Sequence, residues 1–443
     1  MLSDATTIAV LSDIEGSSRK LDLFCQRHPA FVRGADGLFH LAPGASFVHA
    51  GDVPDRFEGT QAAVAELIRL KAEAPDRVLL VAGNRDVNKL RLTAELSREG
   101  LKAPPPVRAA DWKEWLAKQA SARSGKPAGE LTAADLALGE EIAVRLRWIL
   151  ERTMGAPDGF EMRRREMARR GEATDDNAVA ASFVAELSPG GPFRKLLAAS
   201  TLLARRGNTI FAHAGITDDN IGFVPGEADR ATGVDEWIAA LDRWYRAELA
   251  AWERDAFSWD GSGPRPGERL IRYAEPVPGK PANATSVVYC RSVDEQGKIA
   301  LPGKATVEWL AASGVTRLVI GHTPSGELPV VLRTADDGFE VVVADTSRAG
   351  EMETPALISL EGDGLASVLV QGQLTLRGAR RQVAFRSRMG LASPLGKRTA
   401  TGALVVAPGR EGLYTYQLAP GWKIIYDIVE GPASGAPGLE PVD

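Results

Sequence analysis

Three short stretches near the N-terminus decide the fold: TIAVLSDIEG (7–16), FVHAGDVPDR (47–56) and VLLVAGNRD (78–86). Each begins with a short apolar run, which is typical of a strand that is buried on both faces. Each run ends in polar or glycine-containing residues, which predicts a loop at the carboxyl end of the strand. Apolar residues at helical spacing in 61–71 lie between the second and third runs. The order strand–helix–strand indicates an α/β layered fold.

Three more apolar runs of the same kind lie later in the chain and also end in polar residues. They are 209–212 before His213, 318–320 before His322, and 341–344 before Asp345. In α/β sheets, active sites collect beyond the carboxyl ends of the strands. Six runs that each deliver polar groups at that end therefore predict one site built from several loops.

The composition is that of an ordinary globular protein, because 44% of the 443 residues are hydrophobic and 25% are charged. This excludes a disordered chain, a collagen-like repeat and a coiled-coil rod. A total of 53 basic and 58 acidic residues gives a net charge of −5, which indicates neither a nucleic-acid nor a membrane partner. Two cysteines cannot make a disulfide framework. With no signal-like N-terminus and no apolar stretch of roughly 18 residues, we expect a cytoplasmic protein.

Composition and periodicity divide the chain into three parts. Residues 1–99 and 206–372 are predicted to form an α/β core. Residues 100–205 open with three consecutive prolines and continue in helical patterns, which predicts a helical insertion that caps the core. Residues 373–443 contain short, partly alternating segments separated by glycine and proline, which predicts a β-rich C-terminal extension.

Two helical segments allow more than one interpretation. The segment 162–170 holds five arginines, which form either a solvated helix face or a positive patch that guides an anionic substrate. The segment 234–257 carries Trp237, Leu241, Trp244 and Tyr245 at helical spacing, a stripe that is more typical of core packing than of a ligand site. This second segment is expected to join the insertion in the cap.

The polar residues after the strands combine into a candidate metal site. They are carboxylates, an amide and two imidazoles: Asp13, Glu15, Asp52, Asn84, His213 and His322. Carboxylate and carbonyl oxygens suit manganese or magnesium, and imidazole shifts the preference toward manganese, iron or zinc. Two metal ions about 3.5–4 Å apart would clamp a phosphoryl group and generate a hydroxide nucleophile at neutral pH.

These motifs, taken in order, resemble those of the calcineurin-like metallophosphoesterases, in particular the phosphoprotein-phosphatase branch. Members carry Asp–Xaa–His, Gly-Asp-Xaa-Xaa-Asp-Arg, Gly-Asn-His-Asp/Glu and two separate histidines, the second often in Gly-His-Thr-Pro. The matching segments here are 13–15, 51–56, 83–86, His213 and 321–324. The resemblance covers about 1–95 and 205–350 and implies a four-layer α/β/β/α sandwich with the site at the shared edge of two mixed sheets.

The resemblance implies a role for each matching residue. The implied metal ligands are Asp13 and Glu15 for the first ion, Asp52 for both ions, and Asn84, His213 and His322 for the second ion. Arg56 matches an arginine that grips the substrate phosphate, and its planar guanidinium suits that role. Asp55 matches an aspartate on which the catalytic histidine leans, and Asp86 keeps an acidic position that orients the loop.

The sequence departs from the family at two positions. Glu15 replaces a histidine ligand, which adds negative charge and favours harder ions. Arg85 replaces the histidine that protonates the leaving oxygen. Arginine does not release a proton at neutral pH, and general acid catalysis is worth about 10²–10⁴-fold. We expect Arg85 either to hold phosphate as a charge clamp or to pair with Asp55, and we expect a substrate with a good leaving group.

The sequence thus predicts a dinuclear hydrolase, in the first place a phosphoesterase that uses a metal-bridging hydroxide, with manganese or iron favoured over zinc. The expected substrate is anionic and phosphorylated: a protein phosphate, a dinucleotide polyphosphate or a cyclic nucleotide. Arg291 and Arg348 are either further phosphate-binding residues or loop residues. Two alternatives stay open: a metallohydrolase of a non-phosphate substrate, such as a peptide modification, and an inactive binding or regulatory protein on the same fold.

Overall fold

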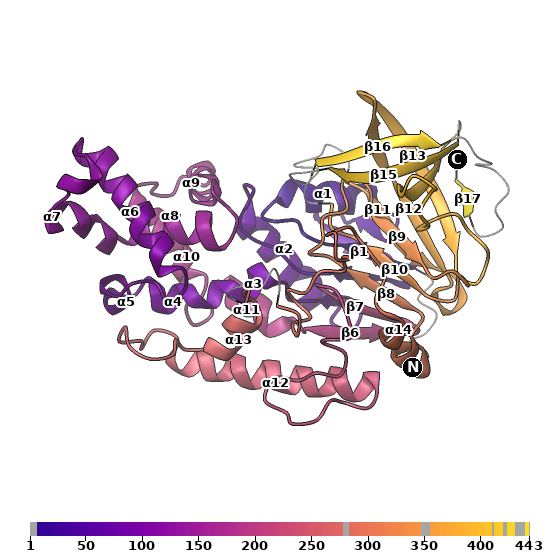
Figure 1. The fold of residues 1–443 in the computed structure, drawn as a ribbon, viewed down its shortest axis with the longest axis horizontal. Coiled ribbons are helices and arrows are strands. Elements are labelled where there is room, and N and C mark those ends of the chain that lie inside the picture. The colour runs from indigo at the N-terminus through magenta and orange to yellow at the C-terminus, as the bar shows by residue number, and fades with distance from the viewer. Residues whose placement is uncertain are drawn as a thin grey trace.

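The computed structural model describes residues 7–277, 283–346, 355–409, 412–419, 423–429 and 439–442. These residues form a mixed α/β fold with several sheets. In Figure 1 the sheets and their C-terminal continuation occupy one side of the molecule, and a group of helices extends from the other side. The predicted apolar runs all lie in strands, so the α/β interpretation of the sequence is confirmed.

A seven-stranded sheet contains the three N-terminal runs. Its strands, in sheet order, are β17 (Leu439–Pro441), β13 (Ala379–Arg388), β12 (Ser367–Leu376), β11 (Leu357–Glu361), β1 (Thr7–Leu11), β4 (Ala45–His49) and β5 (Val78–Leu80). Strands β1, β4 and β5 are parallel, so their carboxyl ends lie at the same edge. Strand β11 pairs antiparallel with β1.

A five-stranded sheet contains the later runs. Its strands, in sheet order, are β6 (Leu203–Arg206), β7 (Thr209–Ala212), β8 (Arg317–Ile320), β10 (Glu340–Val343) and β9 (Val330–Arg333). Strands β7, β8 and β10 are parallel and fully buried, as their apolar runs predict. A bridge between Val81 and Thr201 joins the two sheets just beyond β5 and just before β6.

Helices fill the chain between β5 and β6. They are α3 (Asn84–Asn88), η1 (Lys89–Arg91), α4 (Leu92–Glu95), α5 (Arg98–Lys102), α6 (Ala109–Ser124), η2 (Ala128–Glu130), α7 (Ala133–Leu136), η3 (Ala137–Glu140), α8 (Ile142–Trp148), η4 (Ile149–Thr153), α9 (Gly159–Arg169), α10 (Asp176–Ala185) and α11 (Pro192–Ala199). Figure 1 shows α5 to α8 at the end of the molecule that is farthest from the C-terminal strands. The function of these helices as a cap stays a prediction.

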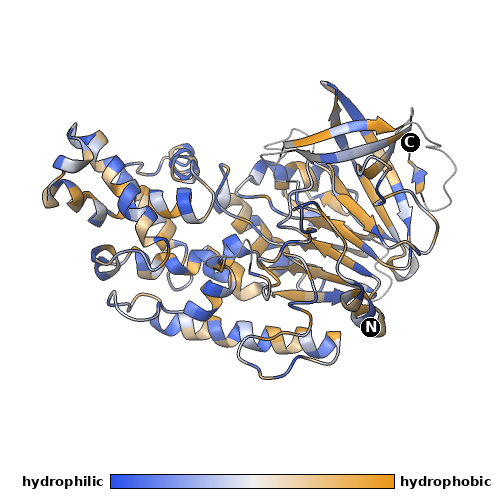
Figure 2. Ribbon diagram, viewed as in Figure 1, coloured by the Kyte–Doolittle hydropathy of each residue, from blue (hydrophilic) through white to orange (hydrophobic). Residues whose placement is uncertain are grey.

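The remaining elements surround the two sheets. They are α1 (Ser18–Arg27), β2 (Phe31–Arg33), β3 (Phe39–Leu41), α2 (Thr60–Glu73), α12 (Val234–Asp255), α13 (Glu268–Tyr273), α14 (Lys304–Ala312) and η6 (Asp363–Leu365). The aromatic stripe of α12 is buried, as expected for core packing. In Figure 2 the central strands are mostly hydrophobic, whereas the helices mix hydrophobic and hydrophilic residues.

Several C-terminal strands extend the core sheet. The C-terminal extension is predicted to begin at residue 373. That predicted boundary falls inside β12, which belongs to the seven-stranded sheet together with β13 and β17. A separate three-stranded sheet consists of β14 (Leu404–Gly409), β15 (Gly412–Ala419) and β16 (Lys423–Val429). It contacts the core through Tyr426, whose hydroxyl accepts a 2.8 Å hydrogen bond from the Glu327 main chain. In the described part of the chain, no helix is long and apolar enough to cross a membrane.

Candidate metal centre

The loops after the strands bring the predicted residues together through unusual backbone conformations. Asp13, Glu15, Asp52 and His322 have φ angles of 50°, 47°, 57° and 59°. Residues other than glycine seldom adopt positive φ, and such residues cluster at functional sites where the surrounding structure holds them in place. Four of the eight positive-φ residues of this kind in the described chain belong to the candidate site.

Glycines allow these loops to approach one another closely. A Cβ on Gly51 would lie 2.6 Å from Nδ1 of His213, and Gly51 itself has a φ of +92°. A Cβ on Gly83 would collide with the main-chain nitrogen and carboxylate of Asp52. The loops after β4, β5 and β7 can therefore meet only because glycine occupies these positions.

One part of the site, which we call the open half, consists of Asp52, Asn84, His213 and His322. One potential ligand atom from each of Asp52, His213 and His322 lies within 4.8 Å of the other two. Nδ1 of His213 is 2.8 Å from the carbonyl oxygen of Ala50, so this nitrogen carries the proton and donates it. The other ring nitrogen, Nε2, lies 3.1 Å from Oδ1 of Asn84 and 3.2 Å from Oδ1 of Asp52.

This geometry needs a positive charge. A histidine that donates from Nδ1 has a lone pair on Nε2, and here that lone pair faces two oxygens that are also acceptors. A proton on Nε2 or a metal ion among the three atoms removes both repulsions, whereas turning over the Asn84 amide removes only the one with Asn84. In a metal-binding histidine, the ring nitrogen that does not bind the metal usually donates a hydrogen bond to a carboxylate or a backbone carbonyl. Nδ1 of His213 makes such a bond.

His322 adds a further acceptor to the open half. Its side chain is buried, and Nε2 has no hydrogen-bond partner among the described residues. Burial lowers the pKa of His322 well below its ordinary value, and the nearby Arg291 guanidinium lowers it further. The imidazole is therefore neutral and able to bind a metal ion, and its ring lies 5.2 Å from that of His213. The residues of the open half fit a metal ion.

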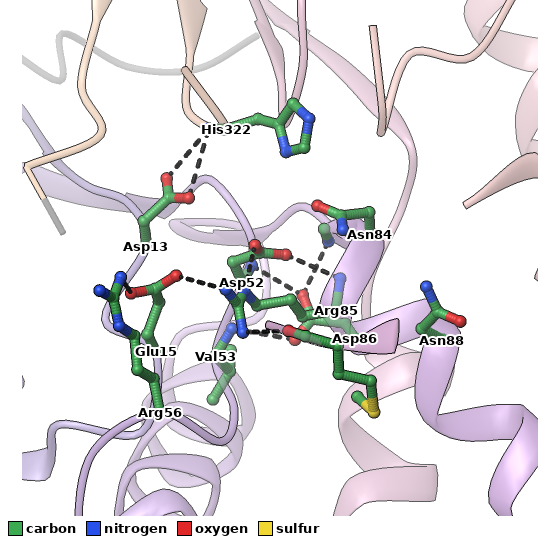
Figure 3. Close-up of polar contacts among 12 residues, drawn as sticks. Asp13, Glu15, Asp52, Val53, Arg56, Asn84, Arg85, Asp86, Asn88 and His322 are labelled. Atoms are coloured by element: carbon green, nitrogen blue, oxygen red, sulfur yellow. Dashed lines mark hydrogen bonds and ion pairs between the residues drawn. The ribbon is translucent and has the colours of Figure 1, made fainter. Parts of the chain in front are cut away.

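The other part of the site, which we call the closed half, consists of Asp13, Glu15 and Arg85. Oε1 of Glu15 lies 3.0 Å from Nη2 of Arg85, and Oε2 lies 3.0 Å from Nη1 of Arg56. Burial raises the pKa of Glu15, but the two guanidinium groups outweigh it, so the pKa is lowered overall. Figure 3 shows Glu15 held between the two arginines, with Arg85 beside Asp52.

Asp13 lies at the edge of the closed half and accepts hydrogen bonds from Ser12 Oγ and, at 3.3 Å, from the main chain of His322. Burial raises the pKa of Asp13 well above its ordinary value, and Asp345 and Asp52 raise it further. A cation near this carboxylate would remove that penalty.

Asp86 connects the site loops. Its carboxylate accepts hydrogen bonds from the main-chain nitrogens of Gly83 (2.7 Å), Val53 (2.9 Å) and Asp52 (3.0 Å). Burial and the Asp52 carboxylate raise the pKa of Asp86 to about 7, although the three N–H groups oppose this shift. This is the geometry that the sequence predicts for a residue that orients the loop.

The alternative pairing of Arg85 with Asp55 is not observed. Asp55 is buried and its Oδ1 lies 3.0 Å from Nζ of Lys89, which is itself fully buried. Lys89 also lies 3.0 Å from Glu186 of the helical segment. Arg85 instead pairs with Glu15 and Asp52, because the loops at positive φ bring those two carboxylates nearer to it.

The five arginines of 162–170 differ in burial: Arg165, Arg169 and Arg170 lie on a solvated face, whereas Arg163 points into the protein. Arg163 is buried and lies 2.8 Å from Glu186 and 3.8 Å from Asp55. Arg164, Arg169 and Arg170 each lie within ion-pair distance of a carboxylate. The segment therefore connects the helices to the loop that carries Asp55.

The remaining predicted residues have different positions. Arg56 is 29% exposed and reaches Glu15. Arg291 donates a 3.0 Å hydrogen bond to the carbonyl of His322, which places it beside the open half. Arg348 lies outside the described residues. Lys20 was not predicted: it is buried, and its Nζ donates to the carbonyl of Asp13 at 3.1 Å. Its only sequence signal is a lysine at the start of the helix that follows the first motif.

Comparisons with known proteins found only weakly similar solved structures. No family model matches the chain, and no curated protein matches it. Among solved structures, a cold-active protein-tyrosine phosphatase of a psychrophilic Shewanella species has a TM-score of 0.42 at 14% identity, over 85% of this chain and 80% of that chain. A protein serine/threonine phosphatase from Saccharomyces cerevisiae has a TM-score of 0.34 at 10% identity, over 81% and 74%.

A metallophosphoesterase from Sphaerobacter thermophilus has a TM-score of 0.27 at 10% identity, over 81% of this chain and 85% of that chain. The neighbours are thus phosphatases and a metallophosphoesterase by name. At these scores they assign neither a family nor an activity, and the functional inference depends on the site residues.

Proposed function

We propose that this chain is a metal-dependent hydrolase of the calcineurin-like class that cleaves phosphoester or phosphoanhydride bonds. The observation that carries the proposal is the open half, where Nε2 of His213 faces two acceptor oxygens and Nε2 of His322 is buried without a partner. Buried acceptors in this arrangement are costly without a cation. The positions at the carboxyl ends of β4, β5, β7 and β8 are those where α/β folds build active sites.

Asp52, Asn84, His213 and His322 would hold the ion. A mixed oxygen and nitrogen donor set suits manganese, iron or zinc. Such an ion supplies Lewis-acid polarisation of a phosphoryl oxygen and lowers the pKa of a water molecule.

The arginines around the site would bind the anionic part of the substrate. Arg56 is partly exposed and presents a planar guanidinium, and Arg291 lies beside His322. Planar guanidinium groups bind phosphate in a bidentate manner, which orients the phosphorus for attack. Asp86 holds the loops of Asp52 and Gly83 together and so keeps the ligands in position.

Arg85 limits the choice of leaving group. Its guanidinium keeps its proton at neutral pH, so it stabilises charge but does not protonate the departing oxygen. The proposed substrate therefore has an acidic leaving group, as in a phosphoanhydride or an activated ester. The phosphoanhydride bonds of nucleoside polyphosphates meet this condition, and the helical segment would select among such substrates.

The test is hydrolysis by purified protein loaded with manganese, iron or zinc, using an aryl phosphate, an aryl diester and a nucleoside triphosphate. We expect cleavage of at least one substrate, loss of that activity in His213→Ala, and normal activity in His40→Ala. His40 is a matched control because it is a partly exposed histidine that pairs with Asp36 and Glu73.

Two other results would contradict the proposal in different ways. A filled metal site with no cleavage of any phosphate substrate would favour a metallohydrolase of a non-phosphate substrate. A protein that binds no metal and cleaves nothing would favour a binding or regulatory protein on the same fold.

A further inference from the structure

The two departures from the family motifs contact each other. Glu15 and Arg85 replace two histidines in separate motifs, and Oε1 of Glu15 lies 3.0 Å from Nη2 of Arg85. Glu15 is negative and Arg85 is positive, whereas the two histidines that they replace are neutral. The net charge of the site is therefore unchanged. The two replacements therefore complement each other.

Arg85 is fixed on three sides. Its Nη2 contacts Glu15, its Nε lies 3.3 Å from Oδ2 of Asp52, and its Nη1 donates a 2.7 Å hydrogen bond to the carbonyl of Met154. Its main-chain nitrogen also donates to Oδ1 of Asp52 at 2.9 Å. The side chain is only 15% exposed. A guanidinium with this many partners has a single well-defined position.

The guanidinium of Arg85 therefore connects the carboxylates that a first metal ion would need. A metal ion in the closed half would have to bind Glu15 and Asp52, and Arg85 contacts one oxygen of each. The second oxygen of Glu15 is held by Arg56 at 3.0 Å. With these contacts, the residues of the closed half do not fit a metal ion, which argues against Glu15 as a ligand and against a second ion.

Side chains supply most of the positive charge that this region needs. Asp13, Glu15, Asp52 and the neighbouring Asp345 bring four buried carboxylates. Arg85, Arg56 and Lys20 bring three cationic side chains, and Nζ of Lys20 lies 3.1 Å from the carbonyl of Asp13. Buried carboxylates need a compensating charge, and for Glu15 and Asp52 the Arg85 and Arg56 side chains supply it.

We propose that Arg85 is a permanent cation in place of the first metal ion, so that the protein binds a single metal ion in the open half. This inference rests on the proposed metal-dependent function. Its chemical consequence is that one metal ion and one guanidinium together face the substrate anion. The guanidinium attracts and orients phosphate oxygens but does not activate water.

The test counts manganese ions and measures whether they are magnetically coupled. Purified protein is stripped of metal and titrated with manganese, and bound ions are counted by elemental analysis and examined by electron paramagnetic resonance. We expect wild type to bind one isolated ion. We expect Arg85→Ala, or Arg85→His combined with Glu15→His if the first variant does not fold, to bind two coupled ions.

Arg56→Ala is the matched control, because it removes the other guanidinium from Glu15 without freeing Asp52. It is expected to keep one ion. Two coupled ions in wild type would overturn the inference while leaving the proposed function intact. One ion in both wild type and the folded Arg85 variants would also overturn it, because another group would then exclude the second ion. No ion in wild type would contradict the proposed function itself.

Discussion

The open half and the closed half of the site are built on the same framework but differ in what surrounds their ligand atoms. In the open half, acceptor atoms of Asp52, Asn84, His213 and His322 face one another or lack a partner. In the closed half, both oxygens of Glu15 are already held by arginines. Loops after strands from both sheets supply these residues, so the fold alone does not determine how many ions bind. The identity of two side chains, Glu15 and Arg85, makes the difference.

The largest expected effect comes from Asp52→Asn, because Asp52 contributes to both halves. The amide keeps the shape but removes the charge that faces His213 and Arg85. We expect manganese affinity to fall by at least about 100-fold and hydrolysis to be lost. Calorimetric titration with manganese measures the affinity. Unchanged affinity would show that the open half is not the metal site.

The second effect concerns the link between the loop that carries Asp55 and the helical segment. Lys89→Met removes a fully buried cation from Asp55 and Glu186, each at 3.0 Å, while methionine still fills the space beside Phe183 and Phe193. Breaking a buried ion pair leaves uncompensated charge, so we expect the free energy of unfolding to fall by about 3–5 kcal/mol. Urea denaturation measures this change.

Lys102→Met provides the comparison for this variant. Lys102 pairs with Glu99 on the surface, and such exposed pairs contribute about 0–1 kcal/mol. We expect little change in the unfolding midpoint. If Lys89→Met were equally mild, the buried network would not connect the helices to the Asp55 loop.

A third, smaller effect tests whether Glu15 and Arg85 act as a pair. Glu15→Gln leaves Arg85 with Asp52 and the Met154 carbonyl, so we expect a loss of about 2–3 kcal/mol in the free energy of unfolding. The double variant Glu15→His with Arg85→His should lose less than the sum of the single variants Glu15→His and Arg85→His. Urea denaturation of the full mutant cycle measures the coupling. Strict additivity would contradict the pairing.

The smallest expected effect is on KM, and it shows whether the substrate anion binds beside the closed half or beside the open half. Arg56→Ala should raise KM by about 10-fold and leave metal binding unchanged, because a charged hydrogen bond contributes about 1.5–3 kcal/mol. Arg291→Ala should raise KM by a similar factor if the anion lies beside His322. Steady-state kinetics with the best substrate separates these cases. Unchanged KM in both variants would place the anion elsewhere.

The sequence predicts the framework well because burial and strand-end loops are local signals. The apolar runs that end at Asp13, Asp52, His213 and His322 are strands in the structure, and their polar residues meet at one place. Each strand can be predicted from a short stretch of sequence, because its apolar residues are followed directly by a polar turn.

The pairings of charged side chains could not be predicted in the same way. Arg85 pairs with Glu15, which is 70 positions earlier in the chain, whereas Asp55 pairs with Lys89. Both choices depend on how separate loops and helices pack in three dimensions, and no residue pattern in the chain specifies this. The boundary at residue 373 shows a similar limit: the β-type segments after it resemble a separate unit in sequence, but β13 and β17 pair along the core sheet.

The most direct test is a crystal structure of the manganese-loaded protein with anomalous scattering data. The comparison of the two halves predicts a single anomalous peak among Asp52, Asn84, His213 and His322, with Arg85 in contact with Glu15. Two peaks, with Arg85 displaced from Glu15, would contradict the difference between the halves. A structure without any peak at full manganese loading would contradict the metal site itself.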